Sequence, residues 1–221
     1  MNFTKWLEGK EPKKILVIMR GVPGSGKSTT ARDILRQLGG GDPIGHIFSA
    51  DNQFIPKTLE LRANGGTVND DFENAEYRSN WHQDKMFKAH MDTVDALKTA
   101  MAQGTTPLIY DNQNVKPRDS RAAAEAAEHF GYEIKIQEPT SEWWLDHSHM
   151  LLDKKRYTKE LDQFANFLGG KHPDMARRYN RSPEKHGNEH GVPIHVIRKN
   201  LDKWQPNLTA QDILGRPQKK V

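Results

Sequence analysis

The stretch Gly21-Val22-Pro23-Gly24-Ser25-Gly26-Lys27-Ser28 decides the fold of this chain, because it fits the P-loop pattern G-x-x-x-x-G-K-[ST] at every fixed position. The residues before it, Ile15 to Met19, are all apolar and predict a buried parallel strand. The residues after it, Ser28 to Leu38, predict a helix. Glycines let the backbone curl with its N–H groups pointing inward, and the helix N-terminus adds positive potential. The segment therefore predicts a phosphate cradle; the alternative is a plain glycine turn ahead of a helix.

The loop also assigns chemical tasks to single residues. The Lys27 ammonium reaches the outer phosphates of a nucleotide, and the Ser28 hydroxyl is a ligand for magnesium. We expect a nucleoside triphosphate to be held by the glycines and their neighbours, which are Gly21, Pro23, Gly24, Ser25, Gly26, Lys27, Ser28 and Thr29.

Length and composition indicate one intracellular α/β domain. A chain of 221 residues suits a single domain or a domain with an insertion. No stretch approaches the roughly 20 apolar residues of a membrane span, and Met1 to Lys14 lacks the apolar core of a signal peptide. The absence of cysteine excludes disulfides and thiolate metal sites. A cytoplasmic protein without membrane contact is the expectation.

The net charge of +4 is concentrated in one part of the chain. Between Asp153 and His186 there are nine Lys or Arg and five Asp or Glu, whereas the rest of the chain is balanced. An anion-binding surface would carry such an excess, and so would a solvated charged helix.

Three further strands are predicted, at Ile44–Phe48, Pro107–Tyr110 and Tyr132–Gln137. Helical patterns lie between and after them, at about 73–103, with Trp81 on its apolar face, and at about 121–130, 142–168 and 194–204. Strands that alternate with helices predict an α/β fold with a parallel sheet and right-handed crossovers.

Polar clusters follow the second and third predicted strands, where ligands of parallel sheets bind. Asp51 lies 24 positions after Lys27 and can accept a proton from an attacking hydroxyl, although a strand-end Asp can also be a helix cap or turn former. Asp111 can order magnesium through water or hold a lid arginine. Asn112 and Asn114 can hydrogen-bond to substrate or backbone, or form Asx turns.

Several other residues allow two interpretations. Trp143 and Trp144 can stack on bases or pack in the core. Arg118 and Arg121 can meet substrate phosphates or lie solvated on a helix. No histidine pair has a strong zinc spacing with a third ligand nearby, which favours surface or capping histidines.

A family resemblance rests on elements that occur in a fixed order along the chain. They are the P-loop through Thr29, Ser49-Ala50-Asp51, Asp111-Asn112-Gln113-Asn114, Gly131-Tyr132, Glu138-Pro139 and Asn188-Glu189-His190-Gly191-Val192-Pro193. This series resembles the kinase domain of phage-type polynucleotide kinases. It resembles still more the NEDD4-binding-protein-2-like P-loop domains and the P-loop domain of myelin-type cyclic nucleotide phosphodiesterases. The resemblance covers roughly Ile15 to Trp204, apart from the basic stretch.

The resemblance implies the fold of adenylate-kinase-like P-loop kinases. It implies that Lys27 and Ser28 bind ATP and Mg²⁺, and that Asp51 is the general base for a 5′-hydroxyl of RNA or DNA. Asp111 and Asn114 match the Asp and Asn that the family has on its third strand, and Asp111 joins Ser28 as an expected metal residue.

The chain departs from the family in its arginines. Gly187 stands where the family has a lid arginine before the late Asn188, so the lid cation is expected among Arg177, Arg178, Arg181 and Lys185. No arginine closely follows Asp51, and Arg62 is the nearest downstream.

Together these features predict a single domain over residues 1–221. Its core is expected at about 13–150 and 187–204, a basic lid insertion at about 151–186, and a flexible tail at 205–221. The expected reaction is transfer of the ATP γ-phosphate to a nucleic acid 5′ end. The alternatives are a kinase for a small acceptor (nucleoside, nucleotide or sugar nucleotide, as in zeta-type toxins) and a non-catalytic nucleotide- or RNA-binding module.

Overall fold

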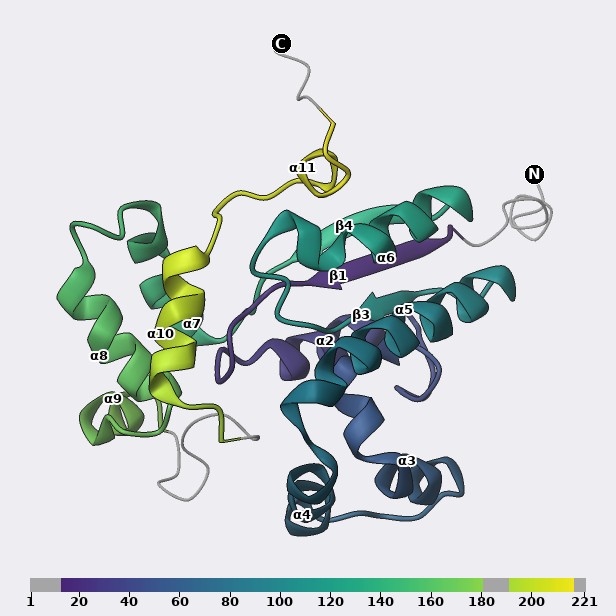
Figure 1. Cartoon of the computed structure of the whole chain (residues 1–221), viewed down its shortest axis with the longest axis horizontal. Coiled ribbons are helices and arrows are strands. Elements are labelled where there is room, and N and C mark those ends of the chain that lie inside the picture. The colour runs from purple at the N-terminus through teal and green to yellow at the C-terminus, as the bar shows by residue number, and fades with distance from the viewer. Residues whose placement is uncertain (1–12, 181–190, 217–221) are drawn as a thin grey trace, which may run out of the picture.

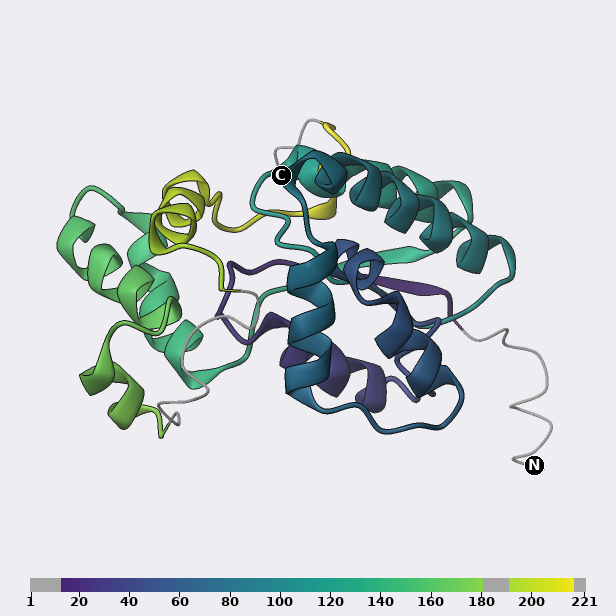
Figure 2. The same ribbon diagram turned by 60° about the horizontal axis from the view of Figure 1, so that its bottom comes forward.

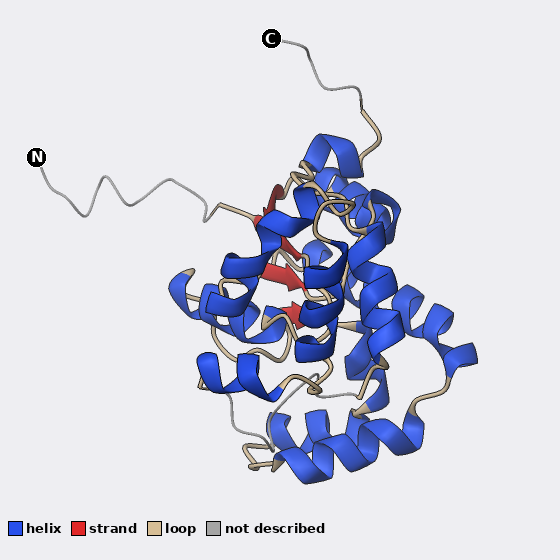
Figure 3. Ribbon diagram, turned by 90° about the vertical axis from the view of Figure 1, so that its left-hand side faces the viewer, coloured by secondary structure: helices blue, strands red, loops and turns tan. Residues whose placement is uncertain are grey.

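A computed structural model of the chain describes residues 13–180 and 191–216, and a four-stranded parallel sheet lies at its centre (Figure 3). The strands are β1 (Ile15–Met19), β2 (Ile47–Phe48), β3 (Leu108–Tyr110) and β4 (Glu133–Gln137), in the order β2-β3-β1-β4. The predicted parallel sheet flanked by helices is confirmed. Strand β2 is shorter than predicted because the carbonyl of Pro43 accepts the N–H groups of His46 and Ile47, which makes a turn of residues 43–46.

The two faces of the sheet are covered by different helices, because successive side chains of a strand point to opposite sides. Val17 and Met19 of β1 pack against α2 (Lys27–Gln37), which follows the P-loop. Leu16 and Ile18 pack on the other face against α5 (Met86–Ala102) and α6 (Pro117–His129). The P-loop therefore leaves the middle of a sheet that is buried on both faces.

Between β2 and α5 the chain forms a small helical lobe, seen at the bottom of Figure 1. It consists of η1 (Ala50–Phe54), α3 (Pro56–Ala63), α4 (Asp70–Asn80) and η2 (Gln83–Lys85). The single helix predicted over 73–103 is therefore wrong, since α4 ends at Asn80 and α5 begins at Met86. The Asn80 side chain donates to the carbonyl of Phe54, and Trp81 leaves the helical conformation at φ −71° and ψ 125°. Trp81 is 40% exposed and does not belong to an apolar helix face.

A second helical unit, which we call the helical arm, comprises residues 142–180 and 194–204 and lies beside the sheet in Figures 1 and 2. Its helices are α7 (Glu142–His147), η3 (Ser148–Leu152), α8 (Thr158–Leu168), α9 (Pro173–Arg178) and α10 (Ile194–Lys203). They share one apolar cluster, in which Trp144, Phe164, Leu201 and Trp204 are buried. The expected boundary at residue 151 therefore falls inside one packed unit, and α10 packs on α8 rather than on the sheet.

The segment after α10 is not the flexible tail that was expected. Helix α11 (Ala210–Ile213) is capped by Thr209, whose side chain accepts the N–H of Asp212, and Ile213 is fully buried against the α6 side of the sheet. Residues 217–221 lie outside the described part. Within residues 13–180 and 191–216, no helix is both long and apolar enough to cross a lipid bilayer.

Candidate phosphate and acceptor site

The P-loop lines a cavity of about 1100 Å³, and residues after β2 and in the helical lobe line the same cavity. The loop residues from Pro23 to Thr29 line it, as predicted for a phosphate cradle, and Asp51 lies in the same wall. Gly21 does not line the cavity, and its N–H donates to the carbonyl of Gln113 at 3.0 Å. One cavity thus brings together the first two strand-end clusters of the sequence.

The conformation of the loop fits a bound triphosphate. Gly24 and Gly26 have φ of 79° and 87°, in the left-handed region that favours glycine. A Cβ at Gly24 would lie 2.5 Å from the carbonyl oxygen of Leu168, so the arm leaves no room for a side chain. The Ser25 hydroxyl is buried and has no hydrogen-bond partner among the described residues, which is expected of a group that meets a ligand oxygen. The first N–H groups of α2 have no acceptor within the helix.

The start of the helical arm supports the loop from outside. The Ser141 hydroxyl donates to the carbonyl of Ser25 at 2.7 Å, and the Trp143 indole N–H donates to the carbonyl of Gly24 at 3.1 Å. Trp143 also lines the cavity, whereas Trp144 is buried in the core of the arm. The core interpretation holds for Trp144, and Trp143 instead helps to shape the loop.

Lys27 forms an ion pair with the predicted Asp111. Its Nζ binds Asp111 Oδ1 and lies 3.5 Å from the Asp111 carbonyl oxygen. The Asp111 side chain is only 5% exposed, at the end of β3, so the pair is largely shielded from water. Among the described residues, the partner of this carboxylate is the P-loop lysine.

Asp51 is held at the cavity wall by two neighbours. The Ser49 hydroxyl caps η1 and accepts the Asp51 N–H at 3.3 Å, so Ser49, and not Asp51, is the cap. The Tyr77 hydroxyl donates to Asp51 Oδ1 at 2.9 Å, and the Tyr77 ring packs edge-on against Phe54 with centroids 5.6 Å apart. Burial raises the pKa of Tyr77, and the Asp51 carboxylate raises it further, so the hydroxyl stays protonated and serves as a donor.

The asparagines after β3 face the protein interior. Asn112 Oδ1 accepts the N–H of Ala50 at 3.0 Å, and Asn114 Nδ2 donates to the carbonyl of Met19 at 2.7 Å. Both side chains are buried and neither lines the cavity. They fix η1 and the end of β1, which is the backbone role considered for them. Gln113, between them, lines the cavity instead and was missed.

Arg20, directly before the P-loop, is a buried cation that the sequence reasoning also missed. Its guanidinium donates to the carbonyls of Asn114 and Gln205 at 3.0 and 2.8 Å and to Glu138 at 3.2 Å, and it lies 4.2 Å from the Trp204 ring. Burial lowers its pKa to about 10, against the opposing effect of Glu138, so it is charged at neutral pH. A charged residue that ends an apolar strand was the available signal.

The predicted substrate cations lie elsewhere, as far as they are described. Arg118 is exposed on α6 with its nearest carboxylate, Asp119, 3.8 Å away, and Arg177 forms an ion pair with Asp174. Neither lines the cavity. The other predicted lid residues, Arg181, Lys185 and Asn188, lie outside the described residues, as does Gly187.

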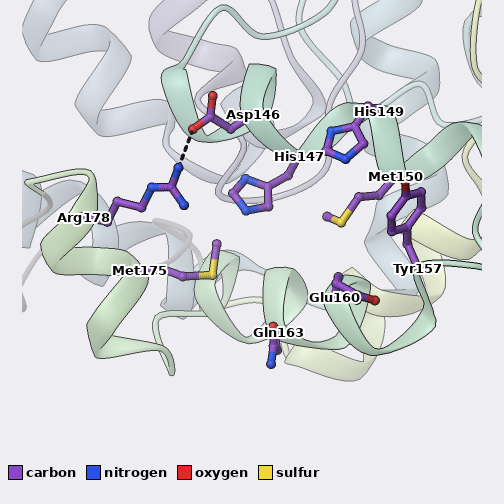
Figure 4. A pocket seen from close by; sticks show the side chains of 9 residues that line it. All are labelled: Asp146, His147, His149, Met150, Tyr157, Glu160, Gln163, Met175 and Arg178. Carbon is purple, nitrogen blue, oxygen red and sulfur yellow. Dashed lines mark hydrogen bonds and ion pairs between the residues drawn. The ribbon is translucent and has the colours of Figure 1, made fainter.

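Arg178 lines a second, smaller cavity of about 430 Å³ within the helical arm (Figure 4). Figure 4 shows its guanidinium directed at Asp146, 3.5 Å away. The neighbouring His147 is stacked on Phe164 with ring centroids 4.7 Å apart, and its Nδ1 donates to the Trp143 carbonyl at 2.9 Å. Burial lowers the pKa of His147, which favours the neutral ring. Among the described residues no three His, Asp or Glu side chains gather as a metal site, here or elsewhere.

The main cavity has one further wall that the sequence analysis did not assign. It is formed by Arg78 and Trp81 at the end of α4 and by Met86 at the start of α5. These residues were predicted to lie on one continuous helix, so nothing in the sequence placed them at the same cavity as Asp51.

Comparison with known proteins agrees with this geometry. A family described as AAA domain, AAA_33, matches residues 16–143, which is more than half of the chain. The chain belongs to the AAA_33 family. The AAA_33 match runs from β1 through the P-loop, Asp51 and Asp111 to the first residues of α7, so the P-loop kinase-like domain is the unit that the family shares.

Two relatives support the AAA_33 assignment. The human NEDD4-binding protein 2 is 24% identical over 161 residues, which are 70% of this chain. The rat YLP motif-containing protein 1 is 29% identical over 139 residues, 59% of this chain, and the mouse protein matches equally. The expected resemblance to NEDD4-binding-protein-2-like P-loop domains is confirmed. The matches span only 8% and 10% of the relatives' own lengths, so they concern this domain and not the whole proteins.

Proposed function

We propose that this AAA_33 domain transfers the γ-phosphate of ATP to the 5′-hydroxyl of an RNA or DNA end. The observation that carries the proposal is the shared cavity, in which the P-loop and the carboxylate of Asp51 face the same space. A phosphate cradle alone binds a nucleotide; a carboxylate held beside it by Tyr77 adds a group that can take a proton.

The reaction that these residues support is an in-line displacement. The P-loop amides and Lys27 hold the β- and γ-phosphates of ATP. The Asp51 carboxylate takes the proton of the attacking hydroxyl, whose oxygen bonds to the γ-phosphorus while the bond to the β–γ bridging oxygen breaks, and ADP leaves. Ser28 lines the cavity and is the residue that would hold Mg²⁺, which supplies charge neutralisation on the phosphates, whereas the Asp111 carboxylate is paired with Lys27 and does not line the cavity.

A second candidate function is a kinase for a small acceptor. Among the described lining residues only Lys27 and Arg78 are cationic, whereas Asp33, Asp51 and Glu142 are acidic. A cavity with this balance attracts a long polyanion less than a groove lined by many Lys and Arg would. The non-catalytic alternative draws its support from the missing lid arginine at Gly187.

The deciding experiment uses γ-labelled ATP, Mg²⁺ and a panel of 5′-hydroxyl oligoribonucleotides, oligodeoxyribonucleotides, nucleosides, nucleotides and sugar nucleotides. The proposal predicts label on the 5′ ends of oligonucleotides. Label on small acceptors alone would overturn it in favour of the second candidate. No label on any acceptor, together with ATP binding, would leave a nucleotide-binding module.

A further inference from the structure

The wall beside Asp51 carries a free cation and an exposed indole. Arg78 and Trp81 line the cavity three residues apart at the end of α4, where side chains at such spacing are neighbours. Arg78 makes no hydrogen bond or ion pair with any residue in 13–180 or 191–216. The Trp81 ring is 40% exposed and stacks on no other ring in these described ranges. A tryptophan exposed in a cavity offers a ligand a large flat apolar ring.

This wall is fixed relative to Asp51. The Tyr77 hydroxyl binds the Asp51 carboxylate, and the Trp81 N–H donates to the Tyr77 carbonyl at 2.8 Å. The Asn80 side chain ties the same helix end to the carbonyl of Phe54, in the turn that carries Asp51. A ligand bound by Arg78 and Trp81 would therefore be held in register with the carboxylate.

The two side chains suit the two parts of one nucleotide. Indole rings stack on nucleobases of any sequence, and a guanidinium pairs with phosphate oxygens. A 5′-hydroxyl end has no phosphate on its 5′ side, so the nearest phosphate is the one that follows the terminal sugar. One aromatic and one cationic contact beside Asp51 would therefore recognise the terminal nucleobase and this first phosphate.

Resting on the phosphotransfer proposed above, we infer that Arg78 and Trp81 form the acceptor subsite, with Trp81 stacked on the terminal base and Arg78 paired with the first phosphodiester. Arg62, the nearest arginine downstream of Asp51, is less suited to this role because it forms an ion pair with Glu73 at 2.6 Å.

The test combines protein variants with altered acceptors. Arg78→Gln and Trp81→Ala are compared with Trp81→Phe, which keeps a stacking ring. Matched controls are Arg32→Gln, an exposed arginine of α2, and Phe87→Ala, a 78% exposed ring of α5; neither lines the cavity. The acceptors are a 5′-hydroxyl oligonucleotide, the same strand with an abasic terminal sugar, and the same strand with a neutral methylphosphonate at the first linkage. The readouts are KM for acceptor and for ATP, and the Kd of the fluorescently labelled strand without ATP.

We expect Trp81→Ala to raise the acceptor KM and Kd about tenfold for the intact strand. For the strand with the abasic terminal sugar, the variant should have the same KM and Kd as the wild type. Arg78→Gln should raise the acceptor KM and Kd about tenfold for the intact strand. For the methylphosphonate strand, this variant should have the same KM and Kd as the wild type. Trp81→Phe, which keeps a smaller stacking ring, should raise the acceptor KM and Kd less than Trp81→Ala does. Both controls should stay within about twofold of wild type, and the KM for ATP should not move. Equal losses on intact and altered strands, or a rise in the KM for ATP instead, would overturn the subsite.

The measurement of Kd without ATP separates this inference from the proposed phosphotransfer. Suppose that the wild-type protein phosphorylates no strand, but Trp81→Ala weakens binding only when the terminal nucleobase is present and Arg78→Gln only when the first phosphate is charged. The subsite is then supported and the proposed reaction is not. If the wild-type protein phosphorylates strands while both variants bind and react normally, the reaction stands and the subsite falls.

Discussion

At the scale of single residues, the ion pair between Lys27 and Asp111 couples phosphate binding to stability. The pair is largely buried, and removal of one partner leaves a buried charge that costs far more than the pair itself contributes. Lys27→Ala should therefore lower the free energy of unfolding by about 3 kcal/mol and also weaken ATP binding at least about tenfold. Urea denaturation and calorimetry with ATP measure the two effects.

The double variant Lys27→Met/Asp111→Asn separates them. With no buried charge left, stability should return to within about 1 kcal/mol of wild type while ATP affinity stays low. If the double variant recovered ATP affinity as well, Lys27 would not be the phosphate ligand.

Tyr77 is a positioning residue for Asp51. Tyr77→Phe keeps the ring against Phe54 and removes only the hydroxyl that donates to Asp51 Oδ1. We expect kcat for phosphotransfer to fall about tenfold through misorientation of the carboxylate, with the KM for ATP unchanged. A merely structural role would lower the melting temperature and leave kcat of the folded protein at the wild-type value.

At the scale of elements, Glu76 joins two helices of the lobe that carries Asp51 and Arg78. Its carboxylate on α4 accepts the N–H groups of Lys57 and Thr58 at 2.7 and 2.9 Å and the Thr58 hydroxyl at 2.7 Å, so it caps the start of α3. Desolvation on its own raises the pKa of Glu76, but the hydrogen bonds from Thr58 and Lys57 outweigh it and the net pKa is lowered. The ionised form is therefore favoured in the folded state.

Glu76→Ala should cost about 1 kcal/mol of stability at neutral pH, the usual scale for loss of a helix cap. Because the pKa of Glu76 is lowered by folding, its contribution is complete above the ordinary Glu pKa and is lost as pH falls through the lowered value. The difference between wild type and variant, measured by urea unfolding, should therefore shrink from pH 7 to about pH 3. A difference that is constant with pH would show that the carboxylate's charge is not what caps α3.

Local patterns predicted β1, the P-loop and the positions of Asp51 and Asp111 at the ends of strands, because each depends on residues that are adjacent in sequence. The ion pair between Lys27 and Asp111 was not predicted, since it joins residues 84 positions apart. The break between α4 and α5 was not predicted. It depends on the bond from Asn80 to Phe54, which joins residues 26 positions apart. For the same reason Arg78 and Trp81 could not be placed beside Asp51. Arg20 was missed because its partners come from the loop after β3, from Glu138 and from the end of the arm.

At the scale of the whole molecule, the described part of the basic stretch, residues 153–180, lies on the helical arm, and none of its Lys or Arg side chains lines the main cavity. The side chain of Lys154 caps α10 by donating to the carbonyls of Asp202 and Trp204, and Arg178 faces Asp146. Exposed arm residues such as Lys155, Arg156 and Arg177 do not line the main cavity, so we expect them to contact only a strand that extends beyond it.

If recognition is confined to the terminal nucleotide, the acceptor KM should depend weakly on salt. One phosphate contact corresponds to a slope of about 0.7 in log KM against log salt for a single strand. The triple variant Lys155→Gln/Arg156→Gln/Arg177→Gln should leave this slope and the KM unchanged. A slope of several units that falls in the triple variant would show instead that the arm binds the strand.

In the proposed reaction, Asp51 takes the proton of the acceptor hydroxyl across the cavity from the P-loop. The most direct measurement is transfer from γ-labelled ATP to a 5′-hydroxyl oligonucleotide by Asp51→Asn, with ATP affinity determined on the same protein. The variant keeps the shape and the Tyr77 contact but cannot accept a proton. We predict ATP affinity like that of wild type and a rate of transfer lowered about 100-fold or more. Transfer at the wild-type rate, or a collapse of ATP affinity, would contradict the claim.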